Sequence, residues 1–520
     1  MNSVRPICVE TVGELLDHWA NATPDQIAVV FEDRRTSFEK LRSRVDRLAN
    51  SLVSLGLQPG DRVALFLDNS DRAWELILAC ARAGLIWVPL NYMLREVEVS
   101  TILRHSGACV LAVDNAHWEV AQLALINSPV RHVIAVDGGS FGHKYEKMIE
   151  SASDAILIRT WSSDDAFCLL YTSGTTGLPK GTELTHGSIL AHASLAISEY
   201  RWTSDCIGLI VLPYFVGATL NCIQIPGLSQ GATLVFNRKF SPEAFARLIR
   251  DEHVTHVQTV PTLLVRLIES KSLEHADFSS IVTIGYGSAP MPVDRLRLLI
   301  ERFGTIFTQI YGLTETCAMA TVLRPNEHSL SGKVEIVARL ASCGRPVPGV
   351  AIRLVDEVGR DVEQGELGEI VIQGDTVMRG YWNAPDLTDR ALDGGWFHSG
   401  DIARQDAEGY IFISDRKTDM IISGAINIFP KEIEEVIYSH PAVSECAVIG
   451  LPDPEWGEVV VAVIAPKVGM SVPAEEIVEL CRQKLAGYKK PRHIYFVDEI
   501  PRNPSGKVLK RHLRTRFTTA

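Results

Sequence analysis

Short apolar stretches alternate with amphipathic helical patterns along most of this 520-residue chain. The stretch "IAVVF" (27–31), for example, precedes a run in which apolar residues recur three and four positions apart from Phe38 to Leu55. Such alternation predicts an α/β fold with helices packed on mostly parallel, buried sheets. Further strands of this kind are predicted at 62–67, 109–114, 132–137, 206–212 and 232–236.

Two helix starts carry recognisable capping residues. Thr36 and Glu39 have the spacing of a capping box, which predicts that Thr36 is the N-cap of the first long helix. Ser241 followed by Pro242 predicts another start, because serine caps well and proline suits the first helical turn.

The pattern changes near residue 415. Before it stand hairpin-like strands rich in turns, "GELGEIVIQG" and "DAEGYIFISDR", which predict a β-rich subdomain. After it, strands and helices form a compact unit of α+β type. We therefore expect a large multi-layer domain (1–415) and a small, mobile α+β domain (416–520), joined at "DRKTD" (415–419).

Composition excludes several classes of protein. The net charge of −12 argues against general binding to nucleic acid or anionic membranes. No apolar run is long enough to span a bilayer, and the N-terminus lacks the apolar core of a signal peptide, so a cytoplasmic protein is expected. The ten cysteines form no Cys-x-x-Cys pair and are expected to be reduced, buried thiols. Only the stretch 482–516 is strongly basic, with eleven Lys/Arg against two acidic residues, which suggests either a solvated surface or a surface for polyphosphate.

One loop suggests phosphate binding. The segment "YTSGTTGLPKG" (171–181) places two glycines and four hydroxyl residues directly after an apolar strand and before Lys180. Glycines let successive N–H groups point into one concavity, and a nest of this kind binds phosphate. The segment is neither a Walker A loop nor a dinucleotide fingerprint. By composition alone, a simple polar turn is an equally good interpretation.

The order of motifs along the chain favours phosphate binding over a simple polar turn. The segment "YTSGTTGLPKG" closely resembles the phosphate-binding signature of the adenylate-forming (AMP-binding) superfamily, in its acyl-CoA synthetase branch. Five further segments resemble that family's motifs in the same order: "YGSAP" (286–290), "YGLTE" (311–315), "GWFHSGD" (395–401), "DRKTDMIISGAINIFPKEIE" (415–434) and "PRNPSGKVLKR" (501–511). The resemblance covers nearly the whole chain.

The resemblance implies a reaction in two halves. A carboxylate attacks the α-phosphate of ATP, giving an acyl-adenylate and pyrophosphate, and CoA then takes the acyl group. It also implies that Thr314 contacts the α-phosphate and that Glu315 holds Mg²⁺, a cation that prefers carboxylate and phosphate oxygens. The β- and γ-phosphates would be wrapped by Thr172, Ser173, Gly174, Thr175, Thr176 and Gly177, with Lys180 nearby.

The same resemblance assigns the rest of the nucleotide. Tyr311 would stack on adenine, and Asp401, with Arg416 as its partner, would bind the ribose hydroxyls. The base would be bordered by Ser288, Ala289 and Gln309, and Gly312 would belong to the same ATP/AMP-binding site.

Three further roles concern the small domain. Lys507 would stabilise the α-phosphate and the attacking carboxylate, and would leave the site when the domain rotates. Thr418 occupies the position of the usual Asp or Lys pivot, a departure that bears on the hinge assignment. Ser423 and Gly424 would line the path of CoA.

The segment 207–236 is expected to line the acyl site together with Gly287. It contains no acidic residue, arginine or lysine, so an uncharged tail is expected. Its site residues would be Tyr214, Phe215, Val216 and Gly217. A fatty or alicyclic monocarboxylic acid fits best, with an aryl acid close behind.

Two further functions stay open beside acid–CoA ligation. The chain could load a carrier protein with the acyl group, or it could be a non-catalytic nucleotide-binding scaffold. The expected partners are the acid, ATP and CoA, without nucleic acid, and a homodimer stays open.

Overall fold

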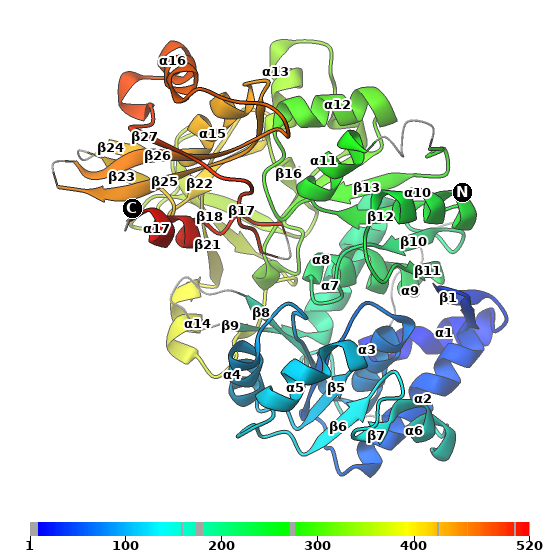
Figure 1. Cartoon of the computed structure of the whole chain (residues 1–520). Helices are drawn as coiled ribbons and strands as arrows, with labels where there is room; N and C mark the ends of the chain where they lie inside the picture. The colour runs from blue at the N-terminus through cyan, green and yellow to red at the C-terminus, as the bar shows by residue number, and fades with distance from the viewer. Residues whose placement is uncertain are drawn as a thin grey trace.

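The computed structural model describes residues 9–157, 160–172, 180–270, 276–423, 426–454, 456–503 and 506–518. Within these ranges the strands form four sheets. The first elements of the chain (blue to cyan) lie at one end of the molecule and the last (orange to red) at the other (Figure 1).

The largest sheet has nine strands in the order β16-β15-β14-β13-β12-β10-β11-β1-β2. Neighbours from β14 to β1 run parallel, and β2, β15 and β16 are antiparallel additions at the edges. The strands are β1 (Ile27–Phe31), β2 (Arg34–Ser37), β10 (Ile207–Ile210), β11 (Thr233–Phe236), β12 (His256–Thr259), β13 (Thr283–Tyr286), β14 (Phe307–Tyr311), β15 (Thr321–Leu323) and β16 (Arg345–Pro346).

A second sheet has eight strands in the order β19-β9-β8-β4-β3-β5-β6-β7, parallel from β8 to β7. The predicted strands 62–67, 109–114 and 132–137 all lie in it. Its members are β3 (Arg62–Phe66), β4 (Ile86–Pro89), β5 (Val110–Val113), β6 (His132–Ala135), β7 (His143–Lys144), β8 (Ala166–Thr172), β9 (Lys180–Thr185) and β19 (Gly380–Tyr381).

Two five-stranded sheets follow in the chain. The first is antiparallel throughout and contains the hairpins expected before residue 415. Its strands are β17 (Ala351–Val355), β18 (Gly368–Gln373), β20 (Leu392–Asp393), β21 (Trp396–Gln405) and β22 (Ile411–Arg416). The second comprises β23 (Ile421–Ser423), β24 (Ile426–Ile428), β25 (Val443–Asp453), β26 (Gly457–Pro466) and β27 (His493–Phe496).

The helices cover the sheets. In the N-terminal part they are α1 (Leu15–Ala22), α2 (Phe38–Ser54), α3 (Asp71–Ala83), α4 (Glu96–Ser106), α5 (Trp118–Ala124), α6 (Tyr145–Ser151), α7 (His186–Tyr200), α8 (Gly217–Thr219), the π-helix η3 (Leu220–Gln224), α9 (Ile225–Gln230), α10 (Pro242–Glu252), α11 (Pro261–Glu269), α12 (Val293–Phe303), the 3₁₀ turn η5 (Thr314–Thr316), α13 (Val334–Ala338) and α14 (Pro385–Ala391). The C-terminal ones are α15 (Pro430–Tyr438), α16 (Ala474–Lys484) and α17 (Lys510–Thr518).

One helix start differs from the prediction. Ser37, not Thr36, caps α2, because its side chain accepts a hydrogen bond from the Lys40 amide at 3.4 Å. Thr36 pairs with Val29 inside β2, and the helix begins at Phe38, so Ser37 is the residue directly before its first turn. The Ser241 cap of α10 is confirmed, since its hydroxyl accepts from the Ala244 amide at 3.1 Å.

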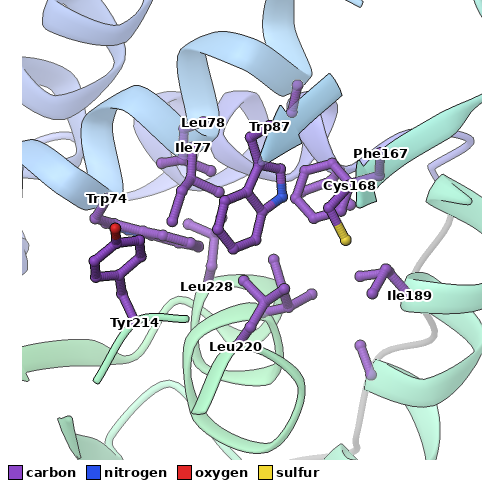
Figure 2. Close-up of a cluster of buried hydrophobic side chains, with 14 of the residues drawn as sticks. Trp74, Ile77, Leu78, Trp87, Phe167, Cys168, Ile189, Tyr214, Leu220 and Leu228 are labelled. Carbon is purple, nitrogen blue, oxygen red and sulfur yellow. The ribbon is translucent and has the colours of Figure 1, made fainter. Parts of the chain in front are cut away.

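The main core joins residues of the eight-stranded sheet, the nine-stranded sheet and the first five-stranded sheet with the helices that pack on them. Trp87 of β4 sits at its centre, with Trp74 and Phe167 beside it and Leu220 approaching from η3 (Figure 2). The nine described cysteines are free and buried. None of the helices in the described ranges is long and apolar enough to cross a membrane.

Candidate functional site

The predicted phosphate loop is anchored by two paired strands. Antiparallel β8 and β9 place Thr172 directly opposite Lys180 in register. Ser173, Gly174, Thr175, Thr176 and Gly177 lie outside the described residues. The ends of the loop are therefore fixed at one edge of the eight-stranded sheet.

Glu315 lies next to this edge. Its carboxylate accepts a hydrogen bond from the hydroxyl of Tyr381 at 2.8 Å, and the ammonium of Lys180 lies 5.1 Å from the centre of the Tyr381 ring. Burial, together with the neighbouring Glu315 carboxylate, raises the pKa of Tyr381 above its ordinary value, so the phenol stays protonated. Thr314 begins the same 3₁₀ turn and is half-buried.

Asp401 is the centre of a second group of polar contacts. One of its carboxylate oxygens accepts from the Tyr311 hydroxyl at 2.8 Å, and the other lies 3.0 Å from Nε of Arg416. The antiparallel register of β21 and β22 sets this pair, since Asp401 and Arg416 are direct partners. Burial opposes the charge of Arg416, but the Asp401 carboxylate and other nearby negative groups outweigh it and raise the pKa of the guanidinium. The expected Asp401–Arg416 partnership is present.

The residues expected around adenine lie in or directly after two adjacent strands, β13 and β14. Gln309 of β14 accepts from the hydroxyl of buried Tyr286 on β13 at 3.1 Å. Ser288, exposed just after β13, has a φ of 67°, a left-handed conformation that is uncommon for a residue other than glycine. Ala289 follows it. Gly312 packs against the backbone at Ala318, where a Cβ would lie 2.5 Å from the carbonyl oxygen and leave no room for a side chain.

Lys507 reaches this cluster from the C-terminal part of the chain. A turn fixes it, with its amide donating to the Asn503 side chain at 2.8 Å. The preceding Gly506 rests against Thr262, so that a Cβ would lie 3.1 Å from the threonine hydroxyl. Burial and the nearby Arg416 lower the pKa of Lys507 to about 8, and the Asp401 carboxylate partly opposes that shift. Lys507 therefore lies near the Asp401–Arg416 ion pair in space, although the three residues are far apart in sequence.

The residues expected at the hinge and along the CoA path lie next in the chain. Thr418 is exposed in a turn directly after β22. The next residue, Asp419, forms an ion pair with Arg514 of α17 at 3.0 Å. Ser423 ends β23 and pairs with Ile426, whereas Gly424 lies outside the described residues.

The expected acyl segment turns from β10 into the core. Tyr214 is buried, and its hydroxyl donates to the Leu65 carbonyl at 2.6 Å, so this residue holds the segment on the second sheet. Phe215 packs edge-on against Tyr92, with ring centres 5.2 Å apart. Val216 is buried. Gly217 lies beside Leu170, where a Cβ would approach within 3.1 Å, and Gly287 leaves no room for a side chain against the Ile310 carbonyl.

Two features of the site were not predicted. Tyr381 was missed because an aromatic residue after glycine carries no chemical signal in a single sequence. The basic stretch is partly neutralised within the protein: ion pairs join Lys489 to Glu432, Lys510 to Glu434 and Arg514 to Asp419. A polyphosphate surface spread over the whole stretch is therefore not supported.

Comparison with known proteins agrees with this geometry. Residues 16–382 match the AMP-binding enzyme family, and residues 432–507 match the AMP-binding enzyme C-terminal domain. The chain is 38% identical to a feruloyl-CoA synthase from an Amycolatopsis species, covering 96% of this chain and 97% of that one. It is 36% identical to a long-chain-fatty-acid–CoA ligase from Mycobacterium tuberculosis, covering 98% and 99%. The structure of ATP-bound MatB from Rhodopseudomonas palustris matches with a TM-score of 0.89 at 30% identity, covering 97% and 99%.

The chain therefore belongs to the family of AMP-binding enzymes, among the AMP-forming acid–CoA ligases. The family resemblance based on the six motifs and the mixed α/β fold are both confirmed.

Proposed function

We propose that this enzyme joins a monocarboxylic acid with an uncharged tail to CoA through an acyl-adenylate, with release of pyrophosphate. The observation that carries the proposal is the position of Lys507 within electrostatic range of the Asp401–Arg416 ion pair, with the Glu315 carboxylate also acting on the charge of Arg416. A basic group, a ribose-binding carboxylate and a metal-binding carboxylate are what attack on an α-phosphate requires. The match to an ATP-bound relative supports this assignment.

Each group has a distinct task in the proposal. Lys507, in its charged form, stabilises the negative charge that builds up between the attacking carboxylate and the α-phosphate, with Thr314 donating a hydrogen bond. Asp401 accepts from the ribose hydroxyls, and Arg416 holds that carboxylate in its ionised form. Tyr311, fixed by its hydroxyl on Asp401, presents its ring to adenine.

Glu315 fits the role of a Mg²⁺ ligand. Its carboxylate is buried and accepts a hydrogen bond from the Tyr381 hydroxyl at one oxygen. The carboxylate can therefore still offer oxygen lone pairs to a cation, and Mg²⁺ prefers such hard oxygen ligands. When bound, the cation supplies neutralisation of phosphate charge. Tyr381 then orients the carboxylate, as a residue behind a metal ligand does.

The division into 1–415 and 416–520, with rotation about Thr418, is also a proposal. Its support is the exposed turn at Thr418, placed after the last strand of one sheet and before the first strand of the next. Rotation would withdraw Lys507 and bring Ser423 and Gly424 to the CoA path. The cytoplasmic location and the homodimer stay predictions.

The acid is proposed to have an uncharged tail. Supporting this, segment 207–236 carries no aspartate, glutamate, lysine or arginine. The relatives include a ligase named for a long-chain fatty acid and one named for ferulate, an aryl acid, so a fatty tail and an aryl tail are both retained.

A screen for pyrophosphate release tests the function. The full chain, with ATP, Mg²⁺ and CoA, is expected to release pyrophosphate and form thioesters with fatty, alicyclic or aryl acids. Free amino acids are expected to give no activity, because their ammonium would be buried without a partner. Thioester formation is followed by mass. Amino-acid-dependent release would contradict the uncharged tail, adenylate without CoA product would indicate carrier loading, and no release with any acid would contradict catalysis.

Replacement of Tyr381 with phenylalanine tests the support of Glu315. Loss of the hydroxyl frees the carboxylate to rotate, and we expect about a tenfold higher Mg²⁺ concentration for half-maximal adenylate formation. A magnesium titration of pyrophosphate release measures it. Tyr410→Phe is the matched control, because Tyr410 likewise donates to a buried glutamate, Glu327, at 2.7 Å outside this cluster. Equal shifts in both variants would contradict the role of Tyr381.

A further inference from the structure

Four polar side chains in and beside the acyl segment are buried without hydrogen-bond partners for some or all of their polar atoms. Among the described residues, these are both ring nitrogens of His192, both amide atoms of Gln224, the Asn221 carbonyl oxygen and the Thr219 hydroxyl. Each residue is at most 1% exposed. Native interiors leave few polar groups unpaired, so such a concentration indicates a group that this structure does not contain.

These side chains lie near η5, the 3₁₀ turn that contains Thr314 and Glu315. Helix α7, which carries His192, packs against the π-helix η3, and the His192 ring lies against the Asn221 backbone without a well-formed hydrogen bond. The amide nitrogen of the Asn221 side chain donates to the Cys317 carbonyl at 2.8 Å. Cys317 directly follows η5, which contains Glu315. The cluster is therefore continuous with the candidate site through Asn221 and Cys317.

The backbone at this cluster forms a short π-helix, which also indicates a functional site. Gln224 ends η3, and short π-helical segments occur frequently at functional sites. Leu220, in the same π-helix, has an ordinary structural role, since it packs towards Trp87 (Figure 2). The unpartnered groups are thus not a consequence of a poorly packed segment.

The chemistry of the cluster selects its ligand. Burial lowers the pKa of His192 to about 4, so the imidazole is neutral and can both donate and accept. A carboxamide can also do both. The set contains no charged side chain, which suits a neutral group with a donor and an acceptor, such as a hydroxyl. An alkyl chain would leave all of these groups unpaired, at a cost for each.

We propose that His192, Thr219, Asn221 and Gln224 form a polar end of the acyl site and bind an uncharged hydroxyl group on the tail of the acid. This rests on the proposed function and deepens it: the preferred substrate is a hydroxylated aryl acid rather than a fatty or alicyclic one.

The test compares acids of matched size. The full chain is assayed for CoA thioester formation with 3-(4-hydroxyphenyl)propenoic acid, its 4-fluoro analogue and decanoic acid. The hydroxyl acid is expected to exceed the fluoro analogue in kcat/KM by about 10- to 100-fold, because only the hydroxyl satisfies the buried groups. Equal values for the two aryl acids, or a preference for decanoic acid, would overturn the proposal.

Variants locate the effect. Gln224→Met and His192→Leu remove polar atoms at similar volume. Each is expected to reduce the ratio of kcat/KM for the hydroxyl acid to kcat/KM for the fluoro analogue by at least about fivefold. His192→Gln keeps a donor and an acceptor and should retain more of this ratio. Gln405→Met is the control outside the acyl segment: Gln405 is half-buried at the end of β21, and its amide donates to the Gly409 carbonyl at 3.3 Å. The control should leave the ratio unchanged.

The outcomes separate the two levels of inference. No thioester with any acid contradicts the proposed function. Thioester formation whose hydroxyl-to-fluoro ratio is the same in wild type, Gln224→Met and His192→Leu contradicts only the polar end, and indicates that water satisfies these groups. If a variant does not fold, the unfolding temperature of the wild-type protein is measured with ATP and each acid instead. The proposal requires the hydroxyl acid to raise that temperature more than the fluoro analogue does.

Discussion

Lys507→Ala is expected to slow adenylate formation about a hundred- to a thousandfold, which corresponds to about 2.7–4 kcal/mol of lost transition-state stabilisation. The ammonium is proposed to reach the α-phosphate site from the C-terminal part of the chain, and alanine leaves the developing charge without it. Thioester formation from supplied acyl-adenylate and CoA should stay near normal, because the lysine is proposed to have left the site in that half-reaction.

Single-turnover assays of each half-reaction measure this split. Lys467→Ala is the control, because that lysine contacts the Pro441 carbonyl rather than the cluster. The pH dependence provides a second measurement. The pKa of Lys507 is lowered to about 8, so its charge is lost as pH rises through that value, and adenylate formation should fall on the alkaline side. Equal damage to both half-reactions would contradict the alternating role of Lys507.

Asp401→Ala is expected to reduce kcat/KM for ATP about a hundredfold. The variant loses the charged hydrogen bonds proposed to hold the ribose and releases the Tyr311 ring from its fixed position. It also leaves Arg416 without its partner. Because the Arg416 side chain is 36% exposed, solvent screens it, and the loss of folding stability should be modest, about 1 kcal/mol.

Steady-state kinetics and thermal unfolding separate these two effects. Asp361→Ala removes a comparable arginine partner at a surface pair, Arg353–Asp361, with 2.6 Å between the charged atoms. That control should keep the KM for ATP of the wild-type protein. An Asp401→Ala enzyme with an unchanged KM for ATP would show that the carboxylate does not hold the ribose.

Those parallel strands that form largely apolar runs could be predicted from the sequence, whereas β12 (HVQT) and β14 (FTQIY) carry polar residues and were not predicted. The strands at 110–113 and 132–135, for instance, needed only such an apolar run. The start of α2 could not be placed to the residue, because Thr36 and Ser37 have similar capping potential. Both residues pair with β1, Thr36 with Val29 and Ser37 with Ile27, so the cap is set by where the helix begins in the folded chain, at Phe38.

The site was predictable only as far as its motifs extended. Asp401 and Arg416 were identified as partners, and their strand register accounts for it. Tyr381 and His192 carry no local signal: one becomes relevant because β19 pairs with β9, and the other because α7 packs on η3. Burial of a polar group without a partner is a three-dimensional property, so a single sequence cannot reveal it.

The turn around Thr418 has a consequence for how the enzyme moves. Arg416 and Lys417 are tied to Asp401 and Glu369 on one side, and Asp419 is tied to Arg514 on the other, so among the ion pairs of the described residues only Thr418 lies between the anchored side chains. A joint this short has few torsion angles to distribute a rotation over, unlike a long flexible tether. We infer that the C-terminal part occupies discrete orientations. Fluorescence energy transfer between dyes on α14 and α16 should then show separate distance populations, exchanged by ATP and CoA, in place of one broad distribution.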